Sequence, residues 1–225
     1  MRAGELNRFW VWGLRIAGPL LHALFSIRVE GLEHVPSTGP AIFVFNHVST
    51  LDGIAVGIEV GWRLRRPTRF LVAAEFLHKP VISWILRGAD QIPINRGRRD
   101  RDALDALTET VRTGRLAGLA PEGRIDDHEG HQGLQRIRSG TARVAVPTGC
   151  PVIPVGVWGA QVRYPRSGLT FRRPWRPKLG LAFGPPILPS GEAVTPREIA
   201  AFTERIRIHL DEQVTRARRL AGGRP

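Results

Sequence analysis

The sequence predicts an α/β fold, with a central, mostly parallel mixed sheet flanked by helices and an N-terminal membrane-associated helical element. Short apolar runs alternate with amphipathic helical patterns, which is typical of a parallel sheet covered by helices. The 225 residues are 42% hydrophobic, which is enough for one sizeable core. No repeat or linker divides the chain, so we expect one domain over residues 29–225 behind a membrane-docking helical segment over residues 1–28.

The first apolar segment, residues 6–27, is dense in aromatic side chains and is interrupted by Arg8 and Arg15. Gly18 and Pro19 are expected to break or kink a helix here, because proline lacks the helical N–H donor. Two interpretations stay open: a core helix of a soluble domain, or a kinked helix pair lying in a membrane interface. The second is favoured because the segment is apolar around its whole circumference. No uninterrupted apolar run reaches the about 18 residues of a spanning helix.

Charge and cysteine content narrow the function classes. The formal net charge is +13 and most of the positive residues are arginine, which favours an anionic partner such as nucleic acid, lipid head groups or a phosphorylated substrate. A basic cluster formed by Arg63, Arg65, Arg66 and Arg69 is expected to be a solvated face that also suits anionic lipid. Cys150 is the only cysteine, which excludes an internal disulfide framework and a cysteine-built zinc site.

Residues 41–53 begin as an unbroken apolar run and end in ionisable side chains. The run predicts a strand that is buried on both faces. Ser49 or Thr50 is then expected to cap a helix. His47 is thereby placed at the carboxyl end of a buried strand, where open α/β sheets bind ligands, and Asp52 in the first helical turn.

His47 and Asp52 each have a plain structural interpretation when taken alone: a satisfied histidine at a strand end, and a carboxylate that completes a helix cap. Taken together, they are the residue types of a general base and its orienting group. A neutral imidazole can take a proton from a hydroxyl, while a carboxylate on the other ring nitrogen fixes the tautomer. No Gly-x-Ser-x-Gly turn supplies a nucleophile, so the attacking hydroxyl is expected to belong to a substrate.

Asn46 and His47, with Asp52 after four intervening residues, resemble the first motif of the glycerolipid acyltransferase family, of the 1-acyl-sn-glycerol-3-phosphate (lysophosphatidic acid) type. Three later stretches occur in the family's order, and the resemblance covers residues 29–185. In the second motif, the family places an arginine that contacts the acceptor's phosphate, and Arg96 stands there. An arginine fork suits this anion, although Arg98 and Arg99 are also close enough to take the role.

The third motif of the family, Phe-Pro-Glu-Gly-Thr-Arg, is altered in this chain. Ala120 replaces the aromatic residue, Glu122 and Gly123 match, and the missing threonine brings Arg124 one position early. The resemblance implies that Glu122 lies by the active site and that Arg124 is displaced from its usual phosphate contact. The fourth motif is represented by residues 152–155, which are expected to bind the acyl donor or to be a plain buried strand.

A run of acidic residues and histidines over residues 126–131 contains the ligand types of a metal site. A divalent ion needs three or four converging groups on a defined scaffold, and this run is glycine-rich and lacks helical spacing. We therefore expect a mobile loop beside the substrate site rather than a metal site.

The remaining elements are predicted from patterning and caps. A strong helix start is formed by Thr195, Pro196 and Glu198. We expect strands over residues 29–36, 70–74, 92–96, 116–120, 151–157 and 178–183, helices over residues 81–86, 100–113 and 139–146, and an irregular basic loop over residues 161–177.

The resemblance implies a peripheral or monotopic acyltransferase at the cytoplasmic face of the cell membrane. It would move a fatty acyl group from acyl-CoA or acyl-ACP to the free hydroxyl of a lysophospholipid, foremost 1-acylglycerol-3-phosphate, which becomes phosphatidic acid. The implied catalytic residues are His47 and Asp52. The implied substrate-binding residues are Arg96, Glu122, Gly123 and Arg124. No cofactor, metal or nucleic acid is expected, and the expected partners are the lysophospholipid, the thioester donor and an anionic membrane surface.

Two alternatives stay open. One is a related O-acyltransferase with a different lipid acceptor, a lyso-amino-lipid or a glycolipid, which the altered third motif suggests. The other is a non-enzymatic basic protein that binds membranes or nucleic acid, which predicts no role for His47 or Asp52 and a steep dependence of binding on salt.

Overall fold

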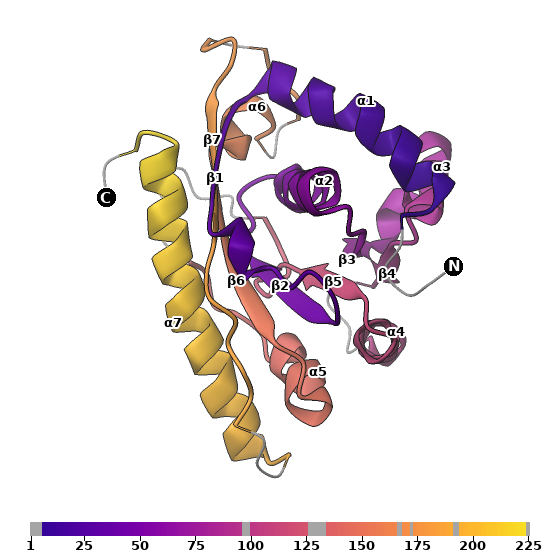
Figure 1. The fold of residues 1–225 in the computed structure, drawn as a ribbon, viewed down its shortest axis with the longest axis vertical. Helices are drawn as coiled ribbons and strands as arrows, with labels where there is room; N and C mark the ends of the chain where they lie inside the picture. The colour runs from indigo at the N-terminus through magenta and orange to yellow at the C-terminus, as the bar shows by residue number, and fades with distance from the viewer. Residues whose placement is uncertain are drawn as a thin grey trace.

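The computed structural model describes residues 6–95, 100–125, 134–165, 168–171, 173–190 and 194–223. These residues form a seven-stranded sheet with helices on both faces (Figure 1). The strand order is β1-β7-β6-β2-β5-β3-β4. The strands are β1 Ser26–Glu30, β2 Ala41–Phe45, β3 Thr68–Ala73, β4 Ile92–Ile94, β5 Leu116–Leu119, β6 Val152–Trp158 and β7 Lys178–Phe183.

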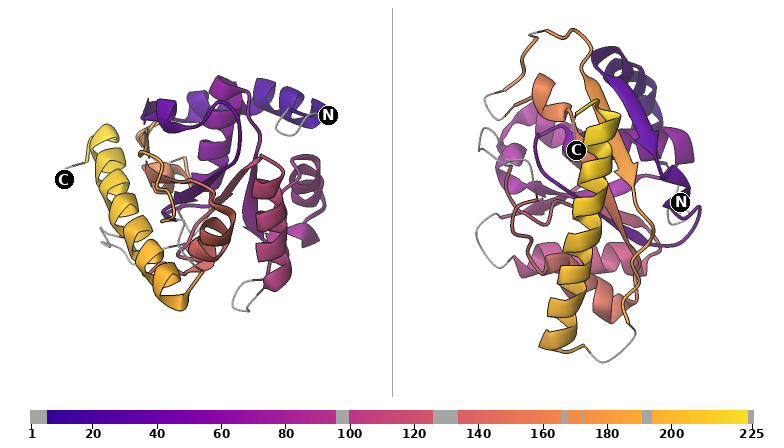
Figure 2. Two further views of the ribbon diagram at one scale, coloured as in Figure 1. Left: turned by 60° about the horizontal axis from the view of Figure 1, so that its bottom comes forward. Right: turned by 90° about the vertical axis from the view of Figure 1, so that its left-hand side faces the viewer.

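The helices cover the sheet in two layers. One layer contains α1, α2 and α3, and the other contains α4, α5 and α7, with α7 running the length of the sheet (Figures 1 and 2). The helices are α1 Arg8–Leu24, α2 Asp52–Leu64, α3 Pro80–Gly88, α4 Arg101–Arg112, α5 Gly140–Thr148, α6 Ala160–Arg163 and α7 Pro196–Leu220, with short 3-10 turns η1 Leu32–His34 and η2 Ala74–His78.

The predicted mostly parallel mixed sheet is confirmed. Strands β6, β2, β5, β3 and β4 run parallel, whereas β7 pairs antiparallel with β6 and β1 pairs parallel with β7. The carboxyl ends of the five parallel strands therefore meet at one edge of the sheet, and the carboxyl ends of β7 and β1 lie at the opposite edge.

Strand β2 lies near the middle of the sheet and is buried on both faces, as its continuous apolar run predicts. Successive side chains point to opposite faces. Phe43 and Phe45 join the core under α1 and α2, while Ile42 and Val44 join the core under α4, α5 and α7. Packing in both cores therefore fixes the position and direction of β2, and with them the place of His47 after its carboxyl end.

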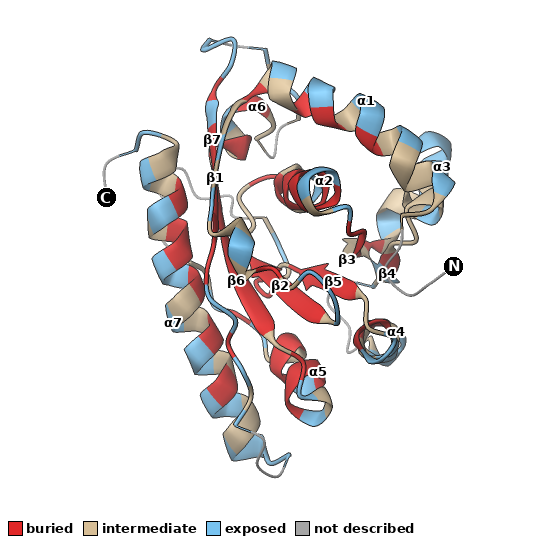
Figure 3. Ribbon diagram, in the orientation of Figure 1, coloured by how far each residue is buried: buried red, intermediate tan, exposed pale blue. Residues whose placement is uncertain are grey.

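The N-terminal segment differs from the predicted kinked helix pair. Pro19 lies inside α1, which continues as one helix from residue 8 to residue 24. Leu14 and Leu21 on its inner side join the core with α2, and Trp12 and Ile16 on its outer side are exposed (Figure 3). Within the described ranges, the structure holds no helix with both the length and the apolar content needed to cross a membrane.

The basic cluster at the end of α2 is only partly a solvated face. Arg66 is 6% exposed and donates to the carbonyl oxygens of Pro36 and Gly39. Arg69 pairs with Asp90 at 3.0 Å. These two arginines are structural cross-links, because a buried guanidinium must be hydrogen-bonded to offset its desolvation.

Helix α7 approaches the sheet closely at two glycines. A Cβ atom at Gly156 of β6 would lie 1.9 Å from the carbonyl oxygen of Gln213, and one at Gly180 of β7 would lie 2.1 Å from that of Ala217. Contacts this short leave no room for a side chain, so these positions set the distance between helix and sheet.

We predict that Gly156→Ala lowers the free energy of unfolding by at least about 2 kcal/mol, because the added methyl group collides with helix backbone that cannot rotate away. Gly13 of α1 is the matched control, since nothing lies within 4 Å of its Cβ position. Gly13→Ala should be neutral or stabilising by up to about 1 kcal/mol. Denaturant unfolding measures both, and equal effects would contradict the close approach.

Candidate active site

His47 follows the carboxyl end of β2 and faces Asp52, the first residue of α2. Its Nδ1 atom lies 3.1 Å from Oδ2 of Asp52. An ionised carboxylate only accepts hydrogen bonds, so Nδ1 carries the hydrogen and Nε2 keeps its lone pair. The imidazole side chain is 13% exposed, whereas the Asp52 side chain is fully buried. The structure thus brings together the two residues that the sequence pairs as base and orienting group.

The two carboxylate oxygens of Asp52 differ in their hydrogen bonds. Its Oδ2 atom also accepts from the backbone amides of Val48 at 2.8 Å and Ser49 at 2.7 Å, while Oδ1 has no hydrogen-bond partner among the described residues. Burial raises the pKa of Asp52 above its ordinary value, and the bonds from His47 and the two amides act in the opposite direction. A carboxylate this buried costs stability, which points to a role other than simple folding.

The predicted cap of α2 by Ser49 or Thr50 is wrong. Leu51 occupies the cap position and makes no side-chain cap bond. Ser49 is fully buried, and its hydroxyl donates to the carbonyl oxygen of Tyr164 at 2.7 Å. The plain interpretation of Asp52 is partly right, because its carboxylate accepts the Ser49 amide three residues back, as in half of a capping box.

Glu122 reaches the same site from β5. Its Oε1 atom accepts the backbone amide of His47 at 3.0 Å, and the residue is 6% exposed. Because β2 and β5 are parallel neighbours, with Val44 paired to Leu119, the residues after both strands meet at one edge. Glu122 therefore holds the main chain of His47, while Asp52 holds its ring.

Asn46 links the site to β6, a contact that the sequence analysis did not predict. Its side-chain amide donates to the carbonyl oxygen of Val157 at 2.9 Å and accepts the Val157 amide at 2.8 Å. The side chain thereby adds one rung to the β2–β6 ladder beyond the last paired residues. No signal in the sequence shows this pairing, because the partners are 111 positions apart.

The other predicted binding residues have different outcomes. Gly123 has a φ of +75°, which suits the tight turn after Glu122. Arg124 is exposed and its Nε donates to Oε1 of Gln135 at 3.3 Å. Arg96 and residues 126–131 lie outside the described residues. No group of three or more metal-ligand side chains occurs in the described part of the chain.

The arrangement is suited to proton abstraction. The imidazole has one nitrogen fixed by a buried carboxylate, and its ring is partly exposed at a sheet edge. Such a base can take a proton from a substrate hydroxyl and return it to a leaving group.

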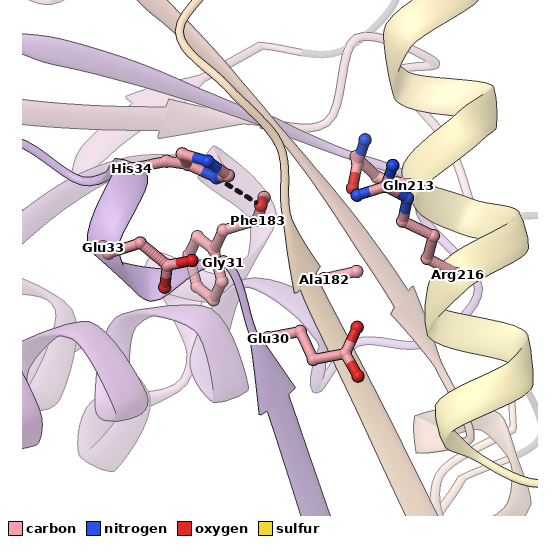
Figure 4. Close-up of a pocket in the computed structure, with 8 residues that line it drawn as sticks. All are labelled: Glu30, Gly31, Glu33, His34, Ala182, Phe183, Gln213 and Arg216. Atoms are coloured by element: carbon pink, nitrogen blue, oxygen red, sulfur yellow. Dashed lines mark hydrogen bonds between the residues drawn. The ribbon is translucent and has the colours of Figure 1, made fainter.

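A separate pocket of about 280 Å³ lies at the other edge of the sheet, where β1 and β7 end (Figure 4). Its lining includes Glu30 and Arg216, and His34 Nδ1 donates to the carbonyl oxygen of Phe183 at 2.9 Å. Its described lining residues include neither His47 nor Asp52. His34 is therefore a histidine with a structural bond, remote from the His47 site.

Comparisons with known proteins agree with this geometry. A model of the Acyltransferase family matches residues 26–158. A chloroplast 1-acyl-sn-glycerol-3-phosphate acyltransferase of Arabidopsis thaliana is 29% identical over 143 residues, covering 62% of this chain and 38% of the relative. The 1-acyl-sn-glycerol-3-phosphate acyltransferase alpha of Mus musculus is 30% identical over 198 residues, covering 84% of this chain and 65% of the relative.

The fold is also found in a solved structure. The crystal structure of the 1-acyl-sn-glycerophosphate acyltransferase of Thermotoga maritima matches with a TM-score of 0.66 at 22% identity, over 92% of this chain and 79% of that one. This match shows a shared fold. The chain spans less than two fifths of the Arabidopsis relative, so the similarity to that protein concerns the matched part only.

The raised pKa of Asp52 predicts a specific pH dependence of stability. A carboxyl group that binds its proton more tightly when folded contributes stability below its unfolded pKa of about 3.9, and this contribution is lost as pH rises through the folded pKa. The Asp52→Asn variant has no ionising group at this position, so it does not lose stability in this way as pH rises. We predict that the unfolding free energy of Asp52→Asn, relative to the wild type, increases from about pH 4 towards neutrality.

Denaturant titrations of both proteins across this pH range measure the difference. A difference that stays flat or decreases with rising pH would show that the hydrogen bonds to Asp52 outweigh its burial.

Proposed function

The chain belongs to the acyltransferase family, and on this premise we propose that it moves a fatty acyl group from a thioester, acyl-CoA or acyl-ACP, to the free hydroxyl of a lysophospholipid. The acceptor we propose is 1-acylglycerol-3-phosphate, which the relatives' names contain, and the product is then phosphatidic acid. The thioester is a cosubstrate, and the proposed chemistry needs no cofactor.

The observation that carries this proposal is the buried Asp52 carboxylate on Nδ1 of His47. Nε2 of His47 takes the proton of the acceptor hydroxyl as its oxygen attacks the thioester carbonyl. The tetrahedral intermediate then collapses, the carbon–sulfur bond breaks, and the proton passes from His47 to the leaving thiolate. Proton transfer by His47 contributes about 10²- to 10⁴-fold in rate. Asp52 stabilises the imidazolium that exists between these steps.

Glu122 acts as a positioning residue in this scheme. Its bond to the His47 amide fixes the main chain from which the imidazole projects. Small displacements of a base are costly, because proton transfer requires hydrogen-bond distance to the reacting hydroxyl. The remaining rate enhancement comes from placing hydroxyl and thioester in contact.

We propose that α1 and α3 form the membrane-facing side of the enzyme. The two helices are joined, since Phe9 and Trp84 pack edge to face at 5.2 Å and the Trp10 indole donates to the carbonyl oxygen of Ala89. Their outer sides are exposed (Figure 3). The exposed apolar residues there are Trp12, Ile16, Leu20, Val81, Trp84 and Ile85.

The guanidinium of Arg15 lies over the ring of Trp12, 4.9 Å from its centroid, and the net charge of the chain is +13. Apolar and aromatic side chains with basic neighbours favour insertion at the level of anionic head groups. An acceptor that resides in the membrane would then be within reach of an enzyme docked by this face.

A different lipid acceptor is a second candidate, because the shortened third motif turns Arg124 towards Gln135 rather than leaving it unbonded for a phosphate. Comparing phosphorylated and unphosphorylated acceptors decides between the two.

We predict that His47→Ala lowers kcat by at least about 10²-fold in a protein that still folds, because the group that takes the proton from the acceptor hydroxyl is removed. His34→Ala is the matched control, since His34 lies at the opposite edge of the sheet and should leave kcat unchanged. The assay measures thiol release from acyl-CoA with 1-acylglycerol-3-phosphate. Full turnover by His47→Ala would refute the catalytic assignment.

We predict that Ile16→Glu and Val81→Glu each weaken binding to anionic vesicles by at least about tenfold, because each places a charge on the docking face. Ile208→Glu on α7 is the control, since Ile208 is also exposed, at 45%, but lies on the other helical layer. Vesicle co-sedimentation measures all three. Equal losses in all variants, or none in the first two, would contradict this docking face.

A further inference from the structure

Arg138 lies against the turn that carries Glu122, although the two residues are far apart in sequence. Its backbone amide donates to the carbonyl oxygen of Pro121 at 2.9 Å. A Cβ atom built on Gly123 would lie 3.2 Å from Nε and 3.3 Å from Cζ of Arg138. The guanidinium therefore rests on Gly123, the residue next to the one that holds the main chain of His47.

The residue before Arg138 anchors this part of the chain in the core. Ile137 is 9% exposed and belongs to the core under α4 and α5, whereas its neighbours Arg136 and Arg138 are exposed. Gly123 leaves room for this close approach, since a Cβ atom there would require the guanidinium to shift by a few tenths of an ångström. Buried Ile137 thus holds the main chain, and the exposed Arg138 side chain lies against Gly123.

The guanidinium of Arg138 has its donors available. Within the part of the chain that the structure describes, it makes no side-chain hydrogen bond and no ion pair. Arg124 differs, because its Nε donates to Gln135. A guanidinium presents five donors in a planar fork that matches the oxygens of a phosphate group.

The chemistry of the acceptor requires a cation near this place. Only a few covalent bonds separate the free hydroxyl of a 1-acylglycerol-3-phosphate from its phosphorus atom. If the hydroxyl meets Nε2 of His47, the phosphate must lie among the side chains around the site. Glu122 bonds to the main chain of His47, and Arg138 is a cation that lies against Gly123, the next residue along the chain.

We propose that Arg138 binds the phosphate of the acceptor beside His47, in place of the arginine that the shortened turn directs to Gln135. This inference rests on the proposed function, because it assumes that the hydroxyl of the same acceptor meets His47. It assigns the substrate class as lysophospholipids with a terminal phosphate, bound by an arginine outside the four sequence motifs.

The test is a binding titration of the wild type and three variants: Arg138→Ala, Arg138→Lys and Arg136→Ala. The probes are a short-chain 1-acylglycerol-3-phosphate, the corresponding monoacylglycerol and CoA. We expect Arg138→Ala to weaken binding of the phosphate-bearing acceptor by about 10- to 100-fold and to leave the other two probes unchanged. Arg138→Lys should lose less, and Arg136→Ala, which changes a neighbour that is also exposed, should match the wild type.

Three results would overturn the proposal: an unchanged Kd in Arg138→Ala, an equal loss for phosphorylated and unphosphorylated acceptors, or a loss confined to CoA. The binding test is independent of turnover. If the wild type binds the phosphorylated acceptor through Arg138 but transfers no acyl group to it, the proposed reaction is wrong and the phosphate site stands.

Discussion

Oδ2 of Asp52 accepts hydrogen bonds from the His47 ring and from the amides of Val48 and Ser49, in surroundings that exclude water. These three bonds fold the chain between β2 and α2 into a turn and aim the imidazole at the sheet edge. The price is a buried carboxylate whose other oxygen, Oδ1, has no partner among the described residues. Buried charge held at such a cost is typical of a functional site.

The site is a junction of three neighbouring strands. Strand β2 supplies His47, the residues after β5 supply Glu122, and β6 accepts the side chain of Asn46. Glu122 fixes the main chain of His47 and Asn46 fixes the end of β2, while Asp52 of α2 fixes the His47 ring. The parallel order β6-β2-β5 places these three carboxyl ends together, so the fold itself creates the site.

Local signals in the sequence predicted the parts of the structure that depend on local patterning. The buried run of β2, the amphipathic α4 and the Thr195 cap of α7 are all found, and the pairing of His47 with Asp52 spans only one turn. Partners distant in sequence were not predictable. The bond from Ser49 to Tyr164 and the burial of Arg66 depend on tertiary contacts, and Pro19 lies inside α1, a helix that packs on α2.

The central claim is that Asp52 holds His47 in the tautomer that leaves Nε2 free to take a proton. Nitrogen NMR of ¹⁵N-histidine-labelled protein, with His47 assigned by a His47→Gln sample, tests it at a pH where the imidazole is neutral. We expect the signals of a protonated Nδ1 and an unprotonated Nε2 in the wild type, and loss of this preference in Asp52→Asn. A hydrogen on Nε2 of His47 in the wild type would contradict the account, because no lone pair would then face the substrate.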